Sequence, residues 1–342
     1  MSIVCEKLPQ SDLVLKSGYK GVEDFVLVKR TERPKDIPLA EKWCMAPCYM
    51  PSLYEEIAQR IENFQVRPDD VWVVTFAKCG TTWTQEMVWQ LCMDLDYETP
   101  KTVILQDRFP FLEFASVLPK ALNLRDEIAK LESMPSPRMI KTHLPAHLLP
   151  KQIWSVKPKI IYVARNAKDT AVSFYHHYRN LHRFPGTFDD FMEAFLHDHV
   201  IFAPYHSHIV DFWRMRNEEN ILFLTFEDMK KDHPTVIEKT AEFLGKSLTE
   251  DQILELADHL SFSKFSKNPS VNMEKLFQNF ETVFGEKQPD KDYNFVRKGA
   301  VAGFREEMTP ELIEAFNKWT ESEVKKWTCD EELRKIFMLS AK

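Results

Sequence analysis

Short apolar runs alternate with longer segments of helical periodicity along most of the chain. Four of these runs are rich in β-branched and aromatic residues and read as strands, namely residues 69–76, 138–143, 159–165 and 220–227. Amphipathic helical patterns follow them, as at residues 81–95, 167–181 and 233–245. Continuously apolar strands that alternate with helices are typical of a parallel sheet covered on both faces. The pattern therefore predicts a single α/β domain with a central, mostly parallel sheet flanked by helices.

The first part of the chain has a different character. Residues 1–52 are rich in charge and proline, which predicts an irregular N-terminal arm packed on a main domain that comprises residues 53–342. No internal repeat interrupts that domain. In parallel α/β sheets ligands bind beyond the carboxyl ends of the strands. We therefore expect binding and catalytic residues in the segments that follow the four predicted strands.

The amino-acid composition limits the kinds of binding partner that the protein could have. The 342 residues are 44% apolar and 28% charged, with a formal net charge of -7, which argues against a nucleic-acid-binding or membrane-coating protein. Six cysteines are too few for a disulfide scaffold and lack zinc-site spacing, which favours a reducing compartment. The N-terminus has no secretory pattern and no apolar run approaches 18 residues, so we expect a cytoplasmic protein.

A candidate anion site follows the first predicted strand. Residues 75–83 read TFAKCGTTW and contain one of only 8 glycines in the chain. A glycine between strand and helix lets backbone amides turn toward one point, and the free N-H groups of the helix start attract anions. Lys78 adds positive charge, and Thr81 and Thr82 add hydroxyl donors. The stretch predicts a P-loop-like phosphate-binding loop, although a tight turn that only caps a helix remains open, and no Walker motif G-x-x-x-x-G-K-[ST] occurs.

Four stretches together resemble one enzyme family. The loop AKCGTTW resembles the PKSGTTW loop of the cytosolic sulfotransferases, which binds the 5'-phosphosulfate of 3'-phosphoadenosine 5'-phosphosulfate (PAPS). KTHLP at 141–145, VARNAKDTAVSFYHH at 163–177 and FVRKGAVAGF at 295–304 resemble further segments of that family in the same order. The resemblance extends over about residues 50–325, and it includes insect members of the family.

The resemblance implies how the cofactor is held. The 5'-phosphate would be bound by the loop residues Lys78, Cys79, Gly80, Thr81 and Thr82. The adenosine would be bound by Trp83, Phe226, Ser261 and Phe262, and the 3'-phosphate by Arg165, Ser173, Arg297, Lys298 and Gly299. Structural alternatives stay open for three of these positions: a core position for Trp83, an ion pair with Asp169 for Arg165, and solvated loop charges for residues 297–298.

The resemblance and elementary chemistry agree on the catalytic groups. His143 follows a predicted strand, and neutral imidazole takes a proton readily near pH 7, so we expect it to be the general base. Lys141 lies two residues earlier and points to the same side of the strand. Lys141 and Lys78 would stabilise the charge that develops as the acceptor oxygen attacks sulfur in line. No metal is required for this reaction, and no carboxylate pair stands beside the loop.

The acceptor is predicted only as a class. A small, hydrophobic alcohol or phenol fits the resemblance, with Phe111, Leu112, Phe174 and His177 predicted to line its pocket, although aromatic residues near strand ends are more often core. A structural role, the usual one for a lone histidine, is expected for His176, His177, His206 and His208.

Several alternatives stay open. The same cofactor chemistry could drive dehydration of an alcohol, as in retinol dehydratase, or the cradle could belong to a binding protein without activity. A kinase would need a Walker lysine and an acidic metal ligand. A partial resemblance of residues 305–314 to the dimerisation stretch of the family leaves a homodimer open. At a helix N-terminus the Cys79 thiolate would be stabilised, which suggests oxidation-sensitive cofactor binding.

Overall fold

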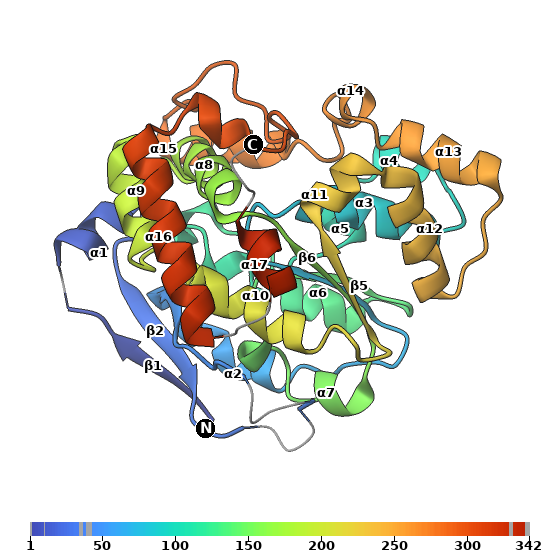
Figure 1. Cartoon of the computed structure of the whole chain (residues 1–342), viewed down its shortest axis with the longest axis horizontal. Coiled ribbons are helices and arrows are strands. Elements are labelled where there is room, and N and C mark those ends of the chain that lie inside the picture. The colour runs from blue at the N-terminus through green and yellow to red at the C-terminus, as the bar shows by residue number, and fades with distance from the viewer. Residues whose placement is uncertain (1, 10, 34–36, 39–42, 328–330, 339–342) are drawn as a thin grey trace.

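The computed structural model describes the chain except residues 1, 10, 34–36, 39–42, 328–330 and 339–342 (Figure 1). Its main sheet has four parallel strands in the order β5-β4-β6-β7. Their bounds are Val71–Thr75 for β4, Met139–Thr142 for β5, Lys159–Ala164 for β6 and Ile221–Thr225 for β7. All four predicted strands are confirmed, and so is the α/β fold with a parallel sheet flanked by helices.

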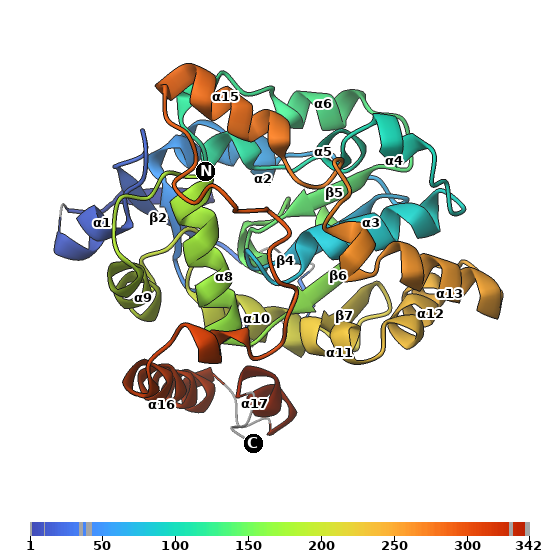
Figure 2. The ribbon, with the colours of Figure 1, turned by 90° about the horizontal axis from the view of Figure 1, so that it is seen from above.

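The two faces of this sheet are buried under different helices. Strand β4 alternates, because Val71 and Val73 pack in one apolar cluster while Trp72 and Val74 pack in the other. Figure 2 shows the helices of the two sides. One face is covered by α3 (Thr81–Cys92), α11 (Phe226–Lys231), α12 (His233–Leu244) and α13 (Glu250–His259). The other is covered by α8 (Ala167–Asn180), α9 (Phe188–Leu196), α10 (Tyr205–Arg214) and α16 (Pro310–Trp327).

Shorter elements complete the described part. The remaining α-helices are α1 (Asp12–Ser17), α2 (Ala58–Glu62), α4 (Thr99–Thr102), α5 (Leu105–Arg108), α6 (Glu127–Ser133), α7 (Ile153–Val156), α14 (Phe262–Phe265), α15 (Glu274–Phe284) and α17 (Glu331–Phe337). The 3-10 helices are η2 (Ser52–Glu56), η3 (Phe114–Ser116), η4 (Lys120–Leu122), η5 (Ala146–Leu148) and η6 (Gly303–Glu306). None of the helices in the described ranges is both long enough and apolar enough to cross a membrane.

The N-terminal segment is more regular than the sequence suggests. It forms a second sheet of three antiparallel strands, β1 (Ile3–Lys7), β2 (Phe25–Arg30) and β3 (Cys48–Pro51). The prediction of an irregular arm is wrong in this respect, because apolar residues of β2 and β3 join the core cluster beneath the main sheet. The domain boundary at residue 52 stays a prediction.

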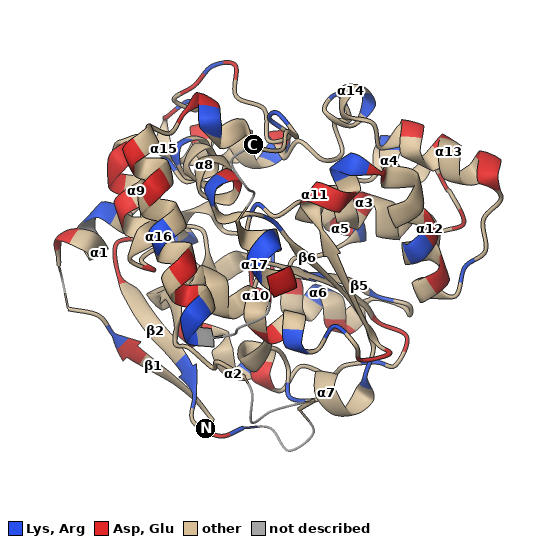
Figure 3. Cartoon of the chain, in the orientation of Figure 1, with Lys and Arg blue, Asp and Glu red and all other residues tan. Residues whose placement is uncertain are grey.

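Charged residues of both signs occur on many elements of the fold in the view of Figure 3. Figure 3 shows Lys and Arg scattered among Asp and Glu over the helices and loops, without gathering on one element. Positive charge is instead concentrated locally, in the cavity described next.

Candidate active site

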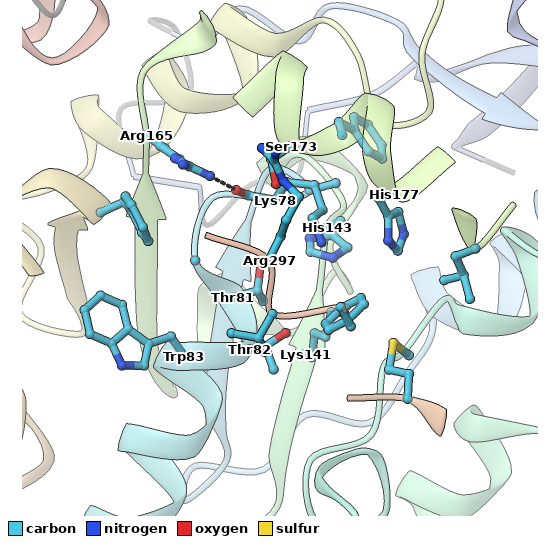
Figure 4. Close-up of a pocket in the computed structure, with 18 of the residues that line it drawn as sticks. Lys78, Thr81, Thr82, Trp83, Lys141, His143, Arg165, Ser173, His177 and Arg297 are labelled. Atoms are coloured by element: carbon cyan, nitrogen blue, oxygen red, sulfur yellow. Dashed lines mark hydrogen bonds between the residues drawn. The ribbon is translucent and has the colours of Figure 1, made fainter. Parts of the chain in front are cut away.

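A cavity lies at the carboxyl ends of the parallel strands, where the topology of α/β sheets places ligand sites. It brings together most of the residues singled out from the sequence (Figure 4). The predicted residues that line it are Lys78, Gly80, Thr81, Thr82, Trp83, Phe111, Lys141, His143, Arg165, Ser173, Phe174, His177, Phe226, Phe262, Arg297 and Gly299. Four others do not line it: Cys79, Leu112, Ser261 and Lys298.

The predicted phosphate loop has the geometry of an anion cradle. Gly80 caps helix α3 with a φ of +100°, a backbone conformation that glycine adopts without strain. A Cβ at Gly80 would lie 2.9 Å from Cδ2 of Phe226, so a larger residue does not fit there. The N-H groups at the start of an α-helix have no acceptor within the helix. This turn therefore offers several backbone donors to one anion.

Thr75 orients the imidazole of His143. Nδ1 of His143 lies 2.9 Å from the carbonyl oxygen of Thr75, and a carbonyl oxygen only accepts, so Nδ1 carries the proton. The Nε2 atom therefore carries the lone pair, and the ring lines the cavity. Thr75 Oγ1 lies 3.2 Å from the same Nδ1 and 2.7 Å from Thr81 Oγ1, which connects the cradle to the histidine.

Glu113 supports the strand end that carries His143. Its buried carboxylate accepts from the backbone N-H of His143 at 2.6 Å and from Oγ1 of Thr142 at 2.8 Å. Burial raises the pKa of Glu113 to about 7, while these hydrogen bonds act in the opposite direction. Nε2 of His208 donates to the carbonyl of His143 at 2.9 Å, so the structural role expected for His208 is seen in the structure.

Sequence reasoning missed Thr75 and Glu113. Thr75 ends β4 and Glu113 lies in the PFLE stretch, whose backbone pairs with β5 through Leu112 N to Lys141 O at 2.9 Å. An acidic residue within an otherwise apolar stretch is the signal that could have identified Glu113, because buried carboxylates need partners.

Burial and nearby positive charge lower the pKa values of the three predicted catalytic groups. Burial lowers the pKa of Lys78 to about 7, helped by the charges of Lys141, Arg165 and Arg297. Burial likewise lowers the pKa of Lys141 to about 8. The pKa of His143 falls well below its usual value, first through burial and then through the charge of Lys141. His143 is therefore neutral. Lys78 and Lys141 are partly deprotonated at a pH near their lowered pKa values, and an anion that enters the cavity would raise both pKa values and favour the charged forms.

A second group of polar residues lines the cavity beside the phosphate loop. Arg165 follows β6 and donates to the carbonyls of Lys78 and Ala300, both at 3.1 Å, while its buried Nε has no partner in the described structure. The alternative of an Arg165 ion pair with Asp169 is not found. Asp169 instead accepts from the amides of Ala302 at 2.8 Å and Phe304 at 3.0 Å. These bonds fasten the final loop to helix α8, beside the cavity.

The two basic residues of the final loop differ. Arg297 lines the cavity and pairs with Glu307 at 2.8 Å. Lys298 does not line the cavity and forms an ion pair with Glu306 at 2.7 Å. This agrees with the alternative of a solvated loop charge. Glu307 also contacts His176 at 2.5 Å, and these hydrogen bonds and charges lower the pKa of Glu307 to about 2 despite its partial burial.

Three aromatic rings, those of Trp83, Phe226 and Phe262, form part of the cavity wall. Trp83 donates from Nε1 to the carbonyl of Leu260 at 2.9 Å and packs edge-on against Phe226. It is half-buried at the cavity wall rather than in the core. A Cβ at Gly299 would lie 2.9 Å from Cδ2 of Phe262, so this glycine permits the ring to lie flat on the loop. Such a wall fits a planar heterocycle.

An apolar compartment extends from His143 in the other direction. Phe111 packs edge-on against the imidazole and lies 4.2 Å beneath the ammonium of Lys141. Phe174 and His177 line this compartment as predicted. Further apolar lining residues were not singled out from the sequence: Phe114, Val117, Leu118, Leu181, Ile201, Phe202, Met273 and Phe295. Leu112 is a core residue, 1% exposed, so its predicted pocket role is wrong.

Two more predicted residues turn away from the cavity. Cys79 is fully buried with its thiol near Oγ1 of Thr170 at 3.6 Å. Burial raises the pKa of Cys79 to about 12, so the predicted stabilisation of its thiolate by the helix is wrong. Ser261 contacts Ser263 at 3.3 Å at the start of α14, outside the cavity.

The fold and this cavity define an α/β enzyme for group transfer, in which an anion cradle and two lysines face a neutral histidine. A comparison with family models assigns residues 68–328 to the sulfotransferase domain. That match includes most of the chain, which therefore belongs to the sulfotransferase family and is a sulfotransferase.

Relatives and solved structures agree with this assignment. The chain is 38% identical to luciferin sulfotransferase of Photinus pyralis, over 79% of this chain and 76% of the relative. It is 36% identical to human sulfotransferase 1E1, over 78% and 88% of the two chains. The structure of retinol dehydratase with androsterone and the inactive cofactor PAP matches 96% of this chain and 98% of that chain, with 30% identity and a TM-score of 0.79.

Proposed function

We propose that this enzyme transfers a sulfuryl group from PAPS to the hydroxyl of a small hydrophobic acceptor, with His143 as the general base. One observation carries this proposal. The hydrogen bond from His143 Nδ1 to the carbonyl of Thr75 leaves the Nε2 lone pair available in a cavity that also contains Lys78 and Lys141. His208, by contrast, uses both ring nitrogens within the protein, one toward the hydroxyl of Tyr162 and one toward the carbonyl of His143.

The residues of the cavity fit a nucleotide with two phosphate ends. Gly80 begins helix α3 at the cavity, and the free backbone N-H groups of the first helical turn suit the 5'-phosphosulfate. Arg165, Ser173 and Arg297 line the same cavity, and two guanidinium groups with a hydroxyl suit a 3'-phosphate. Trp83, Phe226 and Phe262 would hold the adenine between them, and the Lys298 side chain takes no part. When bound, PAPS supplies the activated sulfuryl group.

The protein contributes proton transfer and charge stabilisation. Nε2 of His143 would accept the proton of the acceptor's hydroxyl as its oxygen attacks, while PAPS would supply the sulfuryl group and keep the 5'-phosphate as the leaving group. Lys78 and Lys141, both cationic once the anion is present, stabilise the charge on the sulfuryl and departing oxygens. Apolar walls around Phe111 and Phe174 exclude water, which protects the sulfuryl group from hydrolysis.

A transfer assay with labelled sulfate tests the base. We expect label from PAPS to appear on members of a panel of phenols and alcohols. His143→Ala and His143→Gln should lower kcat by about 10²-fold to 10⁴-fold while the affinity for PAP stays within about threefold. The matched control is His197→Ala, because His197 is an exposed histidine outside the cavity. Equal transfer by wild type and His143→Ala would remove the assigned base.

The 3'-phosphate assignment has a separate test. Calorimetry should show that the wild type binds PAP far more tightly than AMP, which lacks the 3'-phosphate. Arg165→Gln should reduce this ratio at least tenfold while the affinity for AMP changes little. Loss of affinity for both nucleotides in equal measure would contradict the placement of Arg165 at the 3' end.

Dehydration of an alcohol is the second candidate. It is favoured by the similarity to retinol dehydratase over 98% of that chain. Mass spectrometry of products from an allylic alcohol separates the two outcomes, because transfer gives a sulfate ester whereas dehydration gives an alkene and free sulfate. We place sulfate transfer first, because the family match and the curated relatives support it. A cytoplasmic location and a homodimer remain predictions.

A further inference from the structure

Glu307 joins the final loop to helix α8 through two hydrogen bonds. Nη1 of Arg297 donates to Oε1 of Glu307 at 2.8 Å. The other carboxylate oxygen, Oε2, lies 2.5 Å from Nε2 of His176 on α8. Arg297 lines the cavity (Figure 4), whereas Glu307 and His176 do not. The carboxylate therefore contacts this arginine from outside the cavity.

The carboxyl group of Glu307 is ionised at neutral pH. Partial burial acts to raise its pKa, but the hydrogen bonds and charges of His176 and Arg297 lower that pKa to about 2. An ionised carboxylate only accepts hydrogen bonds, so Nε2 of His176 carries a proton and is the donor. Nζ of Lys298 also lies 3.5 Å from Oε1 of Glu307. These basic side chains surround the carboxylate and limit the repulsion that it exerts on an anion in the cavity.

Most hydrogen-bond donors of Arg297 stay available. A guanidinium carries five N-H groups in a planar fork, and Glu307 uses one of them on Nη1. No other hydrogen bond of Arg297 is found in the described part of the chain. An unrestrained arginine side chain samples many rotamers, and confining it when an anion binds costs entropy. Because Glu307 already restricts these rotamers, part of that cost is incurred before an anion binds.

Helix α8 contributes to the cavity and to this anchor. Ser173 lines the cavity, and His176 follows three positions later, so the two residues are neighbours on the helix surface. Asp169, at the start of the same helix, accepts two backbone hydrogen bonds from the final loop. The positions of Ser173 and Arg297 relative to each other are therefore set through one helix.

We propose that Glu307 is a positioning residue for the 3'-phosphate of the nucleotide. It holds the guanidinium of Arg297, is itself held by His176, and leaves the remaining N-H groups of that guanidinium to bind the phosphate. The alternative is a carboxylate that competes with the phosphate for Arg297. A competitor would stand in the cavity, and Glu307 does not line it. This inference rests on the proposed function and adds a residue that increases the selectivity for a nucleotide with a 3'-phosphate.

Calorimetry of Glu307→Gln with PAP and AMP, which differ by the 3'-phosphate, tests this role. The glutamine keeps the size of the side chain but has one acceptor oxygen in place of two, so one of the two hydrogen bonds is lost. We expect PAP binding to weaken about tenfold and AMP binding by less than about twofold. The matched control is Glu306→Gln, because Glu306 is the neighbouring, exposed glutamate and pairs with Lys298 outside the cavity. This control should leave both affinities unchanged.

Two further measurements separate positioning from a general structural effect. In the Arg297→Gln background, Glu307→Gln should change the ratio of the PAP and AMP affinities by less than about twofold, because its effect acts through Arg297. In transfer assays Glu307→Gln should raise the KM for PAPS about tenfold and change kcat by less than about threefold, because Glu307 lies outside the cavity. A smaller fraction of folded protein would change neither the affinity ratio nor KM.

The outcomes distinguish this inference from the proposed function. An unchanged ratio of PAP to AMP affinity in Glu307→Gln, tighter PAP binding, or losses that add up in the double variant would overturn the positioning role and leave sulfate transfer intact. An equal loss of affinity for both nucleotides would overturn it too, because that result indicates a distorted site. A wild type that binds PAP no better than AMP and transfers no label would instead overturn the proposed function itself.

Discussion

The charge of Lys78 predicts how capture of PAPS depends on pH. In the free enzyme the pKa of Lys78 is about 7 and that of Lys141 about 8, in each case lowered mainly by burial. A lowered lysine pKa means that the cation is present below that pH and is lost as the pH rises through it. Since the 5' end of PAPS is anionic, the form that captures it is the protonated one. The value of kcat/KM for PAPS should therefore decline above about pH 7.

The pKa values of the two lysines determine how steeply kcat/KM declines. When one group with a pKa of about 7 controls capture, its charged fraction falls about tenfold for each further pH unit, and loss of the Lys141 charge above about pH 8 makes the decline steeper. Once PAPS is bound, its negative charge raises both pKa values. The decline of kcat should therefore occur at higher pH than the decline of kcat/KM.

The assay is a pH profile of wild type and Lys78→Arg. Initial rates with varied PAPS from pH 6 to pH 9.5 give both parameters. Because a guanidinium stays charged over this range, Lys78→Arg should move the decline of kcat/KM from about pH 7 to about pH 8, where Lys141 titrates. A profile that is flat to pH 9.5, or a decline at the same pH in both enzymes, would refute the reasoning.

Three further predictions follow from single contacts. Gly80→Ala places a Cβ 2.9 Å from the Phe226 ring at a φ of +100°, so calorimetry should show at least tenfold weaker PAP binding; an unchanged Kd would contradict the cradle. Glu113→Ala removes the acceptor of a buried amide and should cost about 1–3 kcal/mol of stability, measured by denaturant unfolding, with Glu56→Ala as an exposed control. Because the Cys79 thiol is buried with a pKa of about 12, peroxide should inactivate wild type and Cys79→Ser alike; selective protection by the serine would restore a redox role.

Much of the site could be predicted because its parts are local. The phosphate loop, the His143 segment and the Arg165 segment are each a strand end with its following residues, and the parallel sheet brings all strand ends to one edge. The spacing of Lys141 and His143 within one strand end likewise places both in one cavity.

The remainder depends on contacts between distant segments. Glu113 reaches His143 across 30 positions and Thr75 reaches it across 68, and no periodic pattern encodes such pairs. The direction in which a loop side chain points cannot be predicted from the sequence pattern either. The sequence therefore predicts that Cys79 binds the cofactor, whereas its thiol is buried in the core. The antiparallel sheet of the N-terminal segment was missed because its first strand is largely exposed and its second and third are separated by a proline-rich stretch.

The hydrogen bonds that hold the final loop in place affect how a nucleotide binds. Asp169 holds the backbone at Ala302 and Phe304, while Arg165 bridges the carbonyls of Lys78 and Ala300. Segments more than 200 positions apart in the chain thus stand already assembled before any nucleotide arrives. The entropic cost of ordering these segments is incurred when the chain folds. The binding site is therefore preorganised and loses little conformational freedom when a nucleotide binds.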